Sequence, residues 1–580
     1  MKNPAQILKR RKFVHLVAAG GSSLLGSSLI GAPVILKSRD QIKSNPVKGT
    51  GLSADLVIAG AGLGGCAAAL AALRNNMSVV MTEETDWVGG QLSQQGVPPD
   101  EHQWIETHGG TKLYRDFRTN IRDYYFRNYP LTPLAASNIY LNPGDGSVSR
   151  LCHEPAVAAA VLEEMLSQYI SSRRLVLLKH HKITSAVVDG DRIRSLDAVS
   201  LVTGKTISLD APWFIDATET GSLLPLTGTE HVTGTESRSD TGEIHAPEKA
   251  KPGNNQAFTV CFAMDYLDGE DHTIEKPGEY EFWRDHTPPL TPPWSGKLLE
   301  LKYSTPSTLI PKELGFDPSG ADTSPFLNLW LYRRIISRKN FINGTYRSDI
   351  TLVNWPQNDY MLGNIITGNE AENSFHVKRA KELSLSLLYW LQTEAPRPGG
   401  GYGWKGLRLR KDIMDTDDGL AKYPYIRESR RIKAIFRVLE EHVGRENRSL
   451  VTGEKENVRA AWFFDSVGTG YYHIDLHPSC EGDNYIDFPS LPFQIPLGSL
   501  IPVRIENLIP ANKNIGTTHI TNGCYRLHPV EWNIGESAGS LIAFAASKKT
   551  IPRNVRENKN LLSEFQNMIR SQGIETEWPE

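Results

Sequence analysis

The chain has 580 residues, 39% of them apolar and 22% charged, which predicts a globular protein of about two or three domains and excludes a mainly disordered, collagen-like or coiled-coil chain. Lysines and arginines number 63 against 66 acidic residues, and the absence of a polybasic run beyond the N-terminus argues against a nucleic-acid partner. The five cysteines show no C-x-x-C spacing, which argues against a zinc knuckle and against a dense disulfide framework.

The first residues have the composition of an export signal. The run RRKFV at residues 10–14 precedes a mildly apolar stretch rich in glycine, serine and leucine that ends near residue 32. Residues 1–32 resemble a twin-arginine signal, which implies export of the folded protein to the periplasm or another extracytoplasmic compartment. The alternative is a basic disordered tail or a retained membrane anchor, and membrane contact is expected only through an uncleaved signal. Residues 33–52 are predicted to be a solvated linker.

A predicted strand then runs into a glycine-rich turn and a helix. Residues 56–59 (LVIA) are followed at once by GAGLGG at residues 60–65 and by an alanine- and leucine-rich helix former. This context makes G-x-G-x-x-G a dinucleotide-binding fingerprint. Gly60 permits the sharp turn, Gly62 lets backbone amides approach a pyrophosphate, and Gly65 lets helix and strand pack closely. The predicted cofactor-binding residues of this turn are Gly60, Gly62, Leu63, Gly64 and Gly65.

A carboxylate ends the second predicted strand. Residues 77–81 (MSVVM) are mostly apolar, and Glu83 follows about 20 residues after the glycines, where a carboxylate can accept two hydrogen bonds from a ribose diol. Glu83 is therefore a predicted cofactor-binding residue. The alternative reading of the glycine segment is a surface turn without a ligand.

Several later segments resemble flavoproteins of the glutathione-reductase type. WVGGQL at residues 87–92 resembles their second glycine pair, and a helix after Pro155, a strand at 175–178, a three-strand meander at 183–209 and WFIDATETG at 213–221 follow in the same order. The resemblance implies FAD as the cofactor. It also implies an α/β fold, with a Rossmann-type FAD-binding domain made of a parallel sheet and a β-meander. It adds Gly89, Gly90 and Gln91 to the predicted cofactor-binding residues.

The C-terminal part resembles a bacterial family of FAD-dependent oxidoreductases. A predicted strand at 507–513 leads into a loop at 515–529 with the pattern THxxxGxxRxxP, and a helix with GxxAG runs to about residue 546. Further matches lie at 425–432 and 465–477, so the resemblance spans most of the chain. It implies non-covalent FAD, a small-molecule substrate and an electron acceptor of unidentified kind.

Three residues near the start of that helix complete the predicted cofactor-binding set. Pro529 suits the first helical turn, and a helix N-terminus there would stabilise negative charge on a reduced flavin. Arg526 either adds a fixed positive charge and binds FAD oxygens or forms a structural salt bridge. Asn533, which departs from the family pattern together with Glu531 and Trp532, faces either the flavin edge or the protein core.

Four side chains are predicted to act as acids or bases. Histidine titrates near neutrality, so His519 and His528, which flank the segment expected at the flavin ring, are candidates together with Tyr525. His102 is the fourth, because it lies in a polar loop at 96–110 that is predicted to be a lid or a substrate wall. For all four, an ordinary hydrogen-bonded or packed side chain is the alternative.

The same loop also offers potential metal ligands. They are Asp100, Glu101, His102 and His108. Because they show no fixed ligand spacing, no metal site is predicted.

The predicted domain organisation places a substrate domain between two parts of the FAD-binding domain. The FAD-binding parts are residues 53–250 and 441–548, and residues 549–580 form a C-terminal tail helix. The inserted α+β domain, residues 251–440, is expected to contain a strand at 257–264 and a long helix at 377–391. Within it, Asn354, Trp355, Arg408 and Arg410 could hold a sugar or a carboxylate, or form a solvated surface.

The predicted function is that of an FAD-dependent dehydrogenase or oxidase. It would transfer a hydride between an organic small molecule and flavin N5. The alternatives are a lyase or isomerase that requires FAD without net redox chemistry, and a non-catalytic binding protein that keeps the FAD-binding fold.

Overall fold

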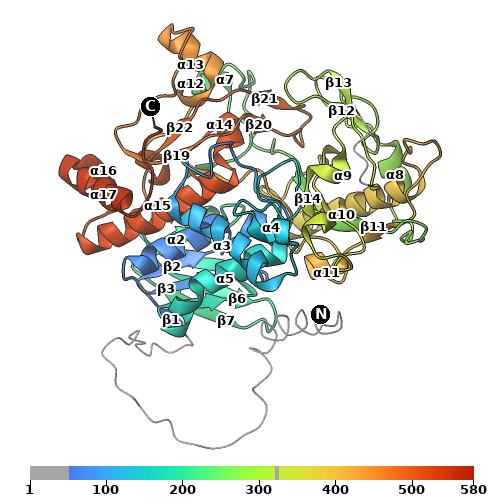
Figure 1. Cartoon of the computed structure of the whole chain (residues 1–580). Coiled ribbons are helices and arrows are strands. Elements are labelled where there is room, and N and C mark those ends of the chain that lie inside the picture. The colour runs from blue at the N-terminus through green and yellow to red at the C-terminus, as the bar shows by residue number, and fades with distance from the viewer. Residues whose placement is uncertain (1–50, 320–324, 580) are drawn as a thin grey trace, which may run out of the picture.

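The computed structural model describes residues 51–319 and 325–579 (Figure 1). The predicted export signal and the linker up to residue 50 lie outside the described residues. Strand β1 (Gly51–Ser53) opens the described chain, so the fold starts slightly before the predicted boundary at residue 53. No helix within these described ranges combines the length and the apolar character needed to cross a membrane.

A five-stranded parallel sheet forms the centre of the fold and contains strands from both ends of the chain. The strand order is β23-β8-β2-β3-β4. The strands are β2 (Leu56–Ala59), β3 (Val79–Thr82), β4 (Leu175–Leu178), β8 (Trp213–Asp216) and β23 (Leu508–Pro510). Their near-continuous apolar sequences suit strands covered on both faces, and four of the five are buried at every position. The predicted α/β fold with a parallel sheet is confirmed.

A smaller antiparallel sheet corresponds to the predicted meander. Strands β5 (His181–Asp189), β6 (Arg192–Ser200) and β7 (Thr206–Asp210) follow one another along the chain, and β1 pairs in parallel with β7. The turn between β5 and β6 contains Gly190, whose φ of +58° is a conformation that glycine adopts without strain.

Two helices from opposite ends of the chain, α2 (Leu63–Arg74) and α15 (His528–Ser547), pack directly against each other (Figure 1). Glycines allow this close approach. A Cβ atom on Gly535 would lie 2.1 Å from the carbonyl oxygen of Gly64, and one on Gly539 would lie 2.2 Å from a carbonyl oxygen in the next turn of α2. A larger side chain at either position would therefore force the two helices apart.

Residues 257–426 supply nearly all of a second hydrophobic core. Its main sheet has the order β14-β15-β11-β17, formed by Arg334–Ile336, Ile350–Val353, Phe262–Tyr266 and Leu407–Leu409 in that order. The long helix α10 (Glu370–Thr393) packs in the same core. This helix begins earlier than the predicted residue 377 because Asn369 caps it: the Asn369 side chain accepts hydrogen bonds from the amides of Ala371 and Glu372.

The single strand predicted at 257–264 is two strands. β10 (Phe258–Thr259) pairs with β16 (Asp359–Tyr360), whereas β11 (Phe262–Tyr266) pairs with β15 (Ile350–Val353) in another sheet. A continuous apolar run does not reveal that its two halves have different pairing partners.

The remaining elements complete the chain. The other helices are α3 (Lys112–Asn128), α4 (Pro133–Ser137), α5 (Pro155–Ser171), α6 (Leu223–Leu226), α7 (Arg238–Thr241), α8 (Tyr280–Asp285), α9 (Leu329–Tyr332), α11 (Lys411–Met414), α12 (Glu440–Val443), α13 (Arg445–Thr452), α14 (His519–Tyr525), α16 (Pro552–Glu557) and α17 (Lys559–Ser571). The other strands are β9 (His231–Val232), β12 (Lys302–Ser304), β13 (Pro311–Glu313), β14 (Arg334–Ile336), β17 (Leu407–Leu409), β18 (Arg431–Ile432), β19 (Ser466–Gly470), β20 (Ile474–Leu476), β21 (Ile486–Phe488) and β22 (Phe493–Pro496). The short 3-10 helices are η1 (Gly90–Leu92), η2 (Arg338–Asn340), η3 (Pro356–Asn358) and η4 (Leu497–Leu500).

Candidate functional site

The first part of the site is a cleft at the carboxyl ends of β2 and β3, which we call the nucleotide cleft. The residues that line it include Gly60, Gly62, Thr82, Glu83, Thr218 and Glu219. Gly60 has a φ of +91°, and a Cβ atom there would lie 2.4 Å from the carbonyl oxygen of Ala217, so the turn requires glycine. Gly62 occupies the N-cap of α2 and has no side chain to cap the first amides of the helix, which suits an anionic group.

Glu83 lies at the end of β3 and faces the glycine turn. Its carboxylate accepts hydrogen bonds from the amides of Ala61 (3.2 Å) and Thr85 (2.9 Å). Burial, only partly offset by Thr85, raises the pKa of Glu83 to about 7. The structure therefore holds a carboxyl group that ionises near neutrality where the ribose of a dinucleotide was predicted.

A buried charged group connects the nucleotide cleft with helix α15. We call Lys513, Glu219, Glu531 and Gln91 the Lys513 cluster. The ammonium of Lys513 lies 2.6 Å from Glu219 and 3.5 Å from Glu531, and the Gln91 amide donates to Glu531 at 2.7 Å. The side chains of Lys513 and Glu531 are fully buried. Burial raises the pKa of Glu531 to about 7, although Lys513 acts in the opposite direction.

Unpaired oxygens in and beside this cluster fit the predicted FAD. Within the described part of the chain, four oxygens here lack a hydrogen-bond donor: Oε1 of Glu219, Gln91 and Glu531, and Oδ1 of Asn512. All four can only accept, so the matching ligand must bring donors such as hydroxyl groups. FAD has hydroxyls on its ribityl chain, next to a pyrophosphate that suits the α2 N-terminus. A Cβ atom on Gly62 would lie 2.7 Å from Glu219 Oε1, so the glycine turn lies directly beside the Lys513 cluster.

Gln91 joins the second glycine pair to the start of α15. Gly89, with a φ of +111°, donates its amide hydrogen to the carbonyl of Ala61 (2.8 Å), which ties this segment to the glycine turn. The Gln91 side chain also donates to the carbonyl of Arg526 (3.0 Å). Segments that lie far apart in the sequence thus meet between the nucleotide cleft and Arg526.

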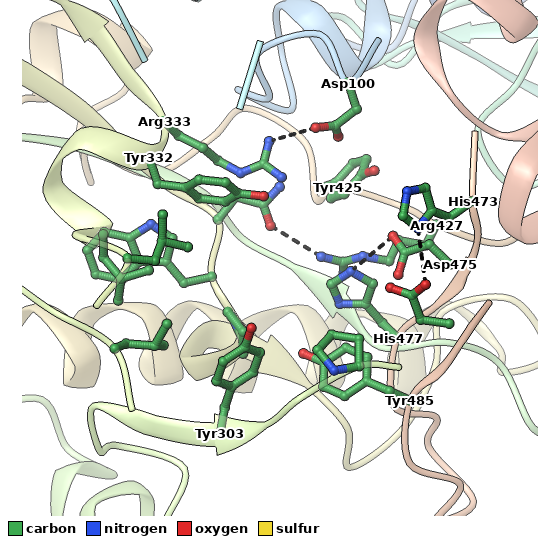
Figure 2. A pocket seen from close by; sticks show the side chains of 18 of the residues that line it. Asp100, Tyr303, Tyr332, Arg333, Tyr425, Arg427, His473, Asp475, His477 and Tyr485 are labelled. Carbon is green, nitrogen blue, oxygen red and sulfur yellow. Dashed lines mark hydrogen bonds and ion pairs between the residues drawn. The ribbon is translucent and has the colours of Figure 1, made fainter. Parts of the chain in front are cut away.

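Figure 2 shows a larger cavity, of about 250 Å³, which we call the large cavity. Its lining residues include Arg526. Its charged and titratable lining residues are Asp100, Arg333, Arg427, His473, Asp475, His477, Asp487 and Arg526. Its aromatic lining residues are Tyr303, Tyr332, Trp355, Tyr425, Tyr472 and Tyr485. Positive and negative side chains are both present, so the lining is polar without a large excess of either charge.

His477 is positioned in this lining by a buried carboxylate. The Nδ1–H group of His477 donates to Asp359 at 2.6 Å, and Asp359 is fully buried. Burial opposes ionisation of Asp359, but Arg427 and His477 outweigh that effect and lower the pKa of Asp359. The guanidinium of Arg427 lies 2.9 Å from Asp359. The other ring nitrogen, Nε2, lies 3.8 Å from the cavity-lining carboxylate of Asp475.

The two histidines predicted to touch substrate lie outside the lining of the large cavity. His519 begins α14, and its Nδ1 lies 2.8 Å from Glu428, which belongs to a buried ion pair with Arg431. Burial opposes charge on the ring, but Glu428 outweighs it and raises the pKa of His519. His528 accepts a hydrogen bond on Nδ1 from the Asp100 amide (3.0 Å), and burial lowers its pKa well below the usual range. Their catalytic roles remain predictions.

The other two predicted acid or base groups have their polar atoms engaged elsewhere. The hydroxyl of Tyr525 donates to the carbonyl of Gln494 (2.7 Å). His102 accepts a hydrogen bond on Nδ1 from the amide of Trp104 and donates from Nε2 to the carbonyl of Gly109 (2.9 Å). Burial lowers the pKa of His102 to about 4, so the ring is neutral. These contacts favour the alternative of ordinary hydrogen-bonded side chains.

The predicted cofactor residues of the C-terminal segment have three different surroundings. Arg526 donates to the hydroxyl of Tyr425 (2.9 Å) and to Asp475 (3.1 Å), so it forms an ion pair and also lines the large cavity. Pro529 lies in the first turn of α15. Asn533 donates to the carbonyl of Thr469 (3.2 Å) in β19. The segment between β23 and α15, expected to be a loop, contains helix α14.

The potential metal ligands of the loop 96–110 have separate partners. Glu101 accepts a hydrogen bond from Tyr114 (2.7 Å) and pairs with Arg118, whereas Asp100 faces Arg333 across 3.5 Å. Among the described residues, no three histidine, cysteine, aspartate or glutamate side chains gather as a metal site.

Sequence reasoning missed most of the residues that line the large cavity. One available signal was the alternation of His473, Asp475 and His477 with the apolar Ile474 and Leu476. The two apolar residues lie in β20 and are buried. Asp475 between them, with His473 and His477 on either side of the strand, lines the cavity. Arg333 carried no comparable local signal, because its partner Asp100 lies far away in the sequence.

Known structures with a detectable likeness include a reductase, a hydroxylase and a dehydrogenase. A mutant of quinol fumarate reductase from E. coli is 12% identical, with 90% of this chain and 74% of that chain covered and a TM-score of 0.30. Anhydrotetracycline hydroxylase from Streptomyces rimosus is 10% identical, with 90% and 66% covered and a TM-score of 0.30. L-proline dehydrogenase from P. horikoshii is 15% identical, with 32% of this chain and only 24% of that chain covered and a TM-score of 0.17.

The family assignment rests on a different comparison. No protein of curated function matches the sequence. The family model for FAD dependent oxidoreductases, by contrast, matches residues 55–569, a range that contains the nucleotide cleft, the Lys513 cluster and the whole lining of the large cavity. The chain therefore belongs to the family of FAD-dependent oxidoreductases, and its cofactor is FAD.

Proposed function

We propose that this protein transfers a hydride between an organic small molecule, bound in the large cavity, and N5 of FAD. The observation that carries the proposal is the His477–Asp359 pair in the wall of this cavity. Arg526 lines the same cavity, and its backbone carbonyl binds Gln91 of the Lys513 cluster. Arg526 thus links the cavity that contains the acid or base group to the groups that fit FAD.

His477 is oriented to take a proton from a substrate. Because Asp359 accepts the Nδ1 proton, a His477 ring that has given up its Nε2 proton would carry its lone pair on Nε2, beside Asp475 in the cavity lining. In the oxidation of an alcohol, the hydroxyl proton would pass to Nε2, the carbon would lose its hydride, and a C=O bond would form. Bound FAD supplies the hydride acceptor. Dioxygen, a quinone or a carrier protein would then accept the electrons and complete the cycle.

The experiment is an anaerobic titration of the purified holoprotein with sugars, amines and hydroxy acids, followed at the flavin absorption band at about 450 nm. We expect one of these substrate classes to bleach the band, and admission of an electron acceptor to restore it. A compound that the protein converts while the flavin stays oxidised throughout would contradict hydride transfer and favour chemistry without net oxidation.

A pH dependence of FAD binding follows from Glu83. An ionised carboxylate accepts two hydrogen bonds from a ribose diol, and burial raises the pKa of Glu83 to about 7 in the protein without cofactor. FAD binding should therefore release a proton below that pH. We expect the Kd of the apoprotein for FAD to fall by up to about tenfold per pH unit from about pH 5 to about pH 7, and then to level off.

Calorimetry in buffers of different ionisation enthalpy measures this proton release directly. Glu83→Gln removes the titrating group, so its FAD affinity should be lower than that of the wild type near neutral pH and nearly independent of pH. An unchanged slope in Glu83→Gln would show that another group titrates.

A further inference from the structure

The pair formed by Asp100 and Arg333 is looser than the other two arginine–carboxylate pairs of the large cavity. Arg333 directly follows α9, and its guanidinium lies 3.5 Å from Asp100, with 10% and 7% of the two side chains exposed. Arg427 and Arg526 approach their carboxylate partners to 2.9 Å and 3.1 Å. The hydrogen bond from Arg333 to Asp100, at 3.5 Å, is longer than is usual for an N–H···O contact. The two groups therefore attract each other, but each keeps capacity for a further hydrogen bond.

Arg333 also has hydrogen-bonding capacity left over. Its Nε atom is buried and has no acceptor in the chain as far as it is described, and its guanidinium lies 5.2 Å from the centre of the Tyr332 ring. The guanidinium makes one long hydrogen bond, to Asp100, so a ligand that brings a closer acceptor for Arg333 would be favoured. The Asp100 carboxylate, which lines the same cavity, requires the opposite partner, a donor.

Neighbouring hydroxyl groups meet both requirements at once. One hydroxyl can donate to Asp100 while the next accepts from Arg333, without any change in net charge. A carboxylate ligand would satisfy Arg333 but would be repelled by Asp100 and Asp475. The chemistry of this pair thus favours a vicinal diol over an anion.

The far side of the cavity suits the apolar face of such a ligand. Tyr303 and Tyr485 lie across the cavity from Asp100 and Arg333 (Figure 2), and Trp355 also lines it. Aromatic rings pack against C–H groups, which a sugar ring presents on its faces. The volume of about 250 Å³ is at the small end for ligand pockets, which suits one sugar unit better than a chain of them.

We propose that the large cavity binds a carbohydrate or another polyol of monosaccharide size, with Asp100 and Arg333 holding two adjacent hydroxyls. This inference rests on the proposed function, because it names the substrate class of the same cavity. The hydroxyl that loses its proton would be the one beside Nε2 of His477.

Binding to the holoprotein tests the inference without requiring turnover. Calorimetric titrations under anaerobic conditions would use neutral polyols, such as glucose, its methyl glycoside and myo-inositol, and monocarboxylates such as acetate and L-lactate. We expect at least one neutral polyol to bind and the monocarboxylates not to bind. Asp100→Asn should weaken polyol binding by about tenfold, because a neutral acceptor replaces a charged one.

The sign of the Asp100→Asn effect separates the two ligand classes. If the cavity takes carboxylates, removal of the Asp100 charge should tighten acetate or lactate binding, and that result would overturn the inference. Asp349→Asn is the matched control, because Asp349 pairs with the neighbouring Arg334 at 2.8 Å and is similarly buried but lies outside the cavity lining. We expect this control to bind polyols like the wild type.

The wild-type protein gives a second readout that needs no folded variant. Bleaching of the flavin by an amine or a hydroxy acid, with no neutral polyol bound at all, would refute the polyol inference and leave the oxidoreductase proposal intact. A polyol that binds but never reduces the flavin would refute hydride transfer from that ligand and leave the binding inference intact.

Discussion

Replacing His477 with asparagine should lower the rate of flavin reduction by its substrate about 10²- to 10⁴-fold, the usual contribution of a positioned acid or base. Asparagine keeps a polar group near Asp359 but cannot take a proton from a substrate hydroxyl. The FAD-fitting groups lie beyond Arg526, so the variant should retain its cofactor. Stopped-flow measurement of the anaerobic half-reaction gives the rate, and the absorption spectrum gives the flavin content.

A matched histidine lies outside the large cavity. His272 is also bound to a carboxylate, that of Glu270 at 2.7 Å. In the His272→Asn variant, the substrate should reduce the flavin at the wild-type rate. If His477→Asn were equally fast while still carrying FAD, His477 would not be the base, and the large cavity would need a different proton acceptor.

Replacing Lys513 with methionine should destabilise the protein by about 3–5 kcal/mol, because it leaves two buried carboxylates without their cation. Glu219 and Glu531 lie 2.6 Å and 3.5 Å from the Lys513 ammonium, and both are at least nine-tenths buried. We expect a lower midpoint of thermal unfolding and release of FAD at a lower temperature than in the wild type. Scanning calorimetry and flavin fluorescence measure these two quantities.

The loss in Lys513→Met should depend on pH in a defined direction. Without the cation, the pKa of Glu531 in the folded state should rise above its present value of about 7, so the folded protein should bind protons more strongly than the unfolded chain. Stability is then lost as the pH rises, and the deficit should be smaller at about pH 6 than at about pH 8. A deficit that is independent of pH would mean that lost packing, not charge, causes it.

A surface ion pair provides the control for Lys513. Lys381 lies 2.7 Å from Asp418, with 39% and 41% of the two side chains exposed. Solvent screens such a pair, so Lys381→Met should cost about 0–1 kcal/mol. An equal loss in both variants would show that removal of any lysine has this effect.

The sequence signals that predict the nucleotide cleft are local. Strand β2, the turn around Gly60 and helix α2 follow one another without interruption, so one stretch of sequence contains both the motif and its context. Helix α14 was not predicted, because its seven residues are too few to show a clear helical repeat of apolar side chains. Its N-cap, Thr518, which accepts from the amide of Thr521, was the available signal.

The large cavity could not be assembled from sequence, because its walls come from distant segments. Asp100 and Arg333 meet across more than two hundred positions, and His477 meets Asp359 across more than a hundred. Nothing local indicates such a meeting. The alternation of polar residues around β20 predicts only that one face of this strand avoids the core. The predicted histidines His519 and His528 lie outside the cavity lining, and their rings are held by Glu428 and by the Asp100 amide.

The contact between α2 and α15 has a consequence for how the protein matures. The amides that suit a pyrophosphate are synthesised several hundred residues before Lys513, Arg526 and the glycine face of α15. A nascent chain therefore lacks part of the FAD-binding surface until α15 has been translated. Stable acquisition of FAD thus has to wait for α15, and a product truncated before this helix would lack the complete site.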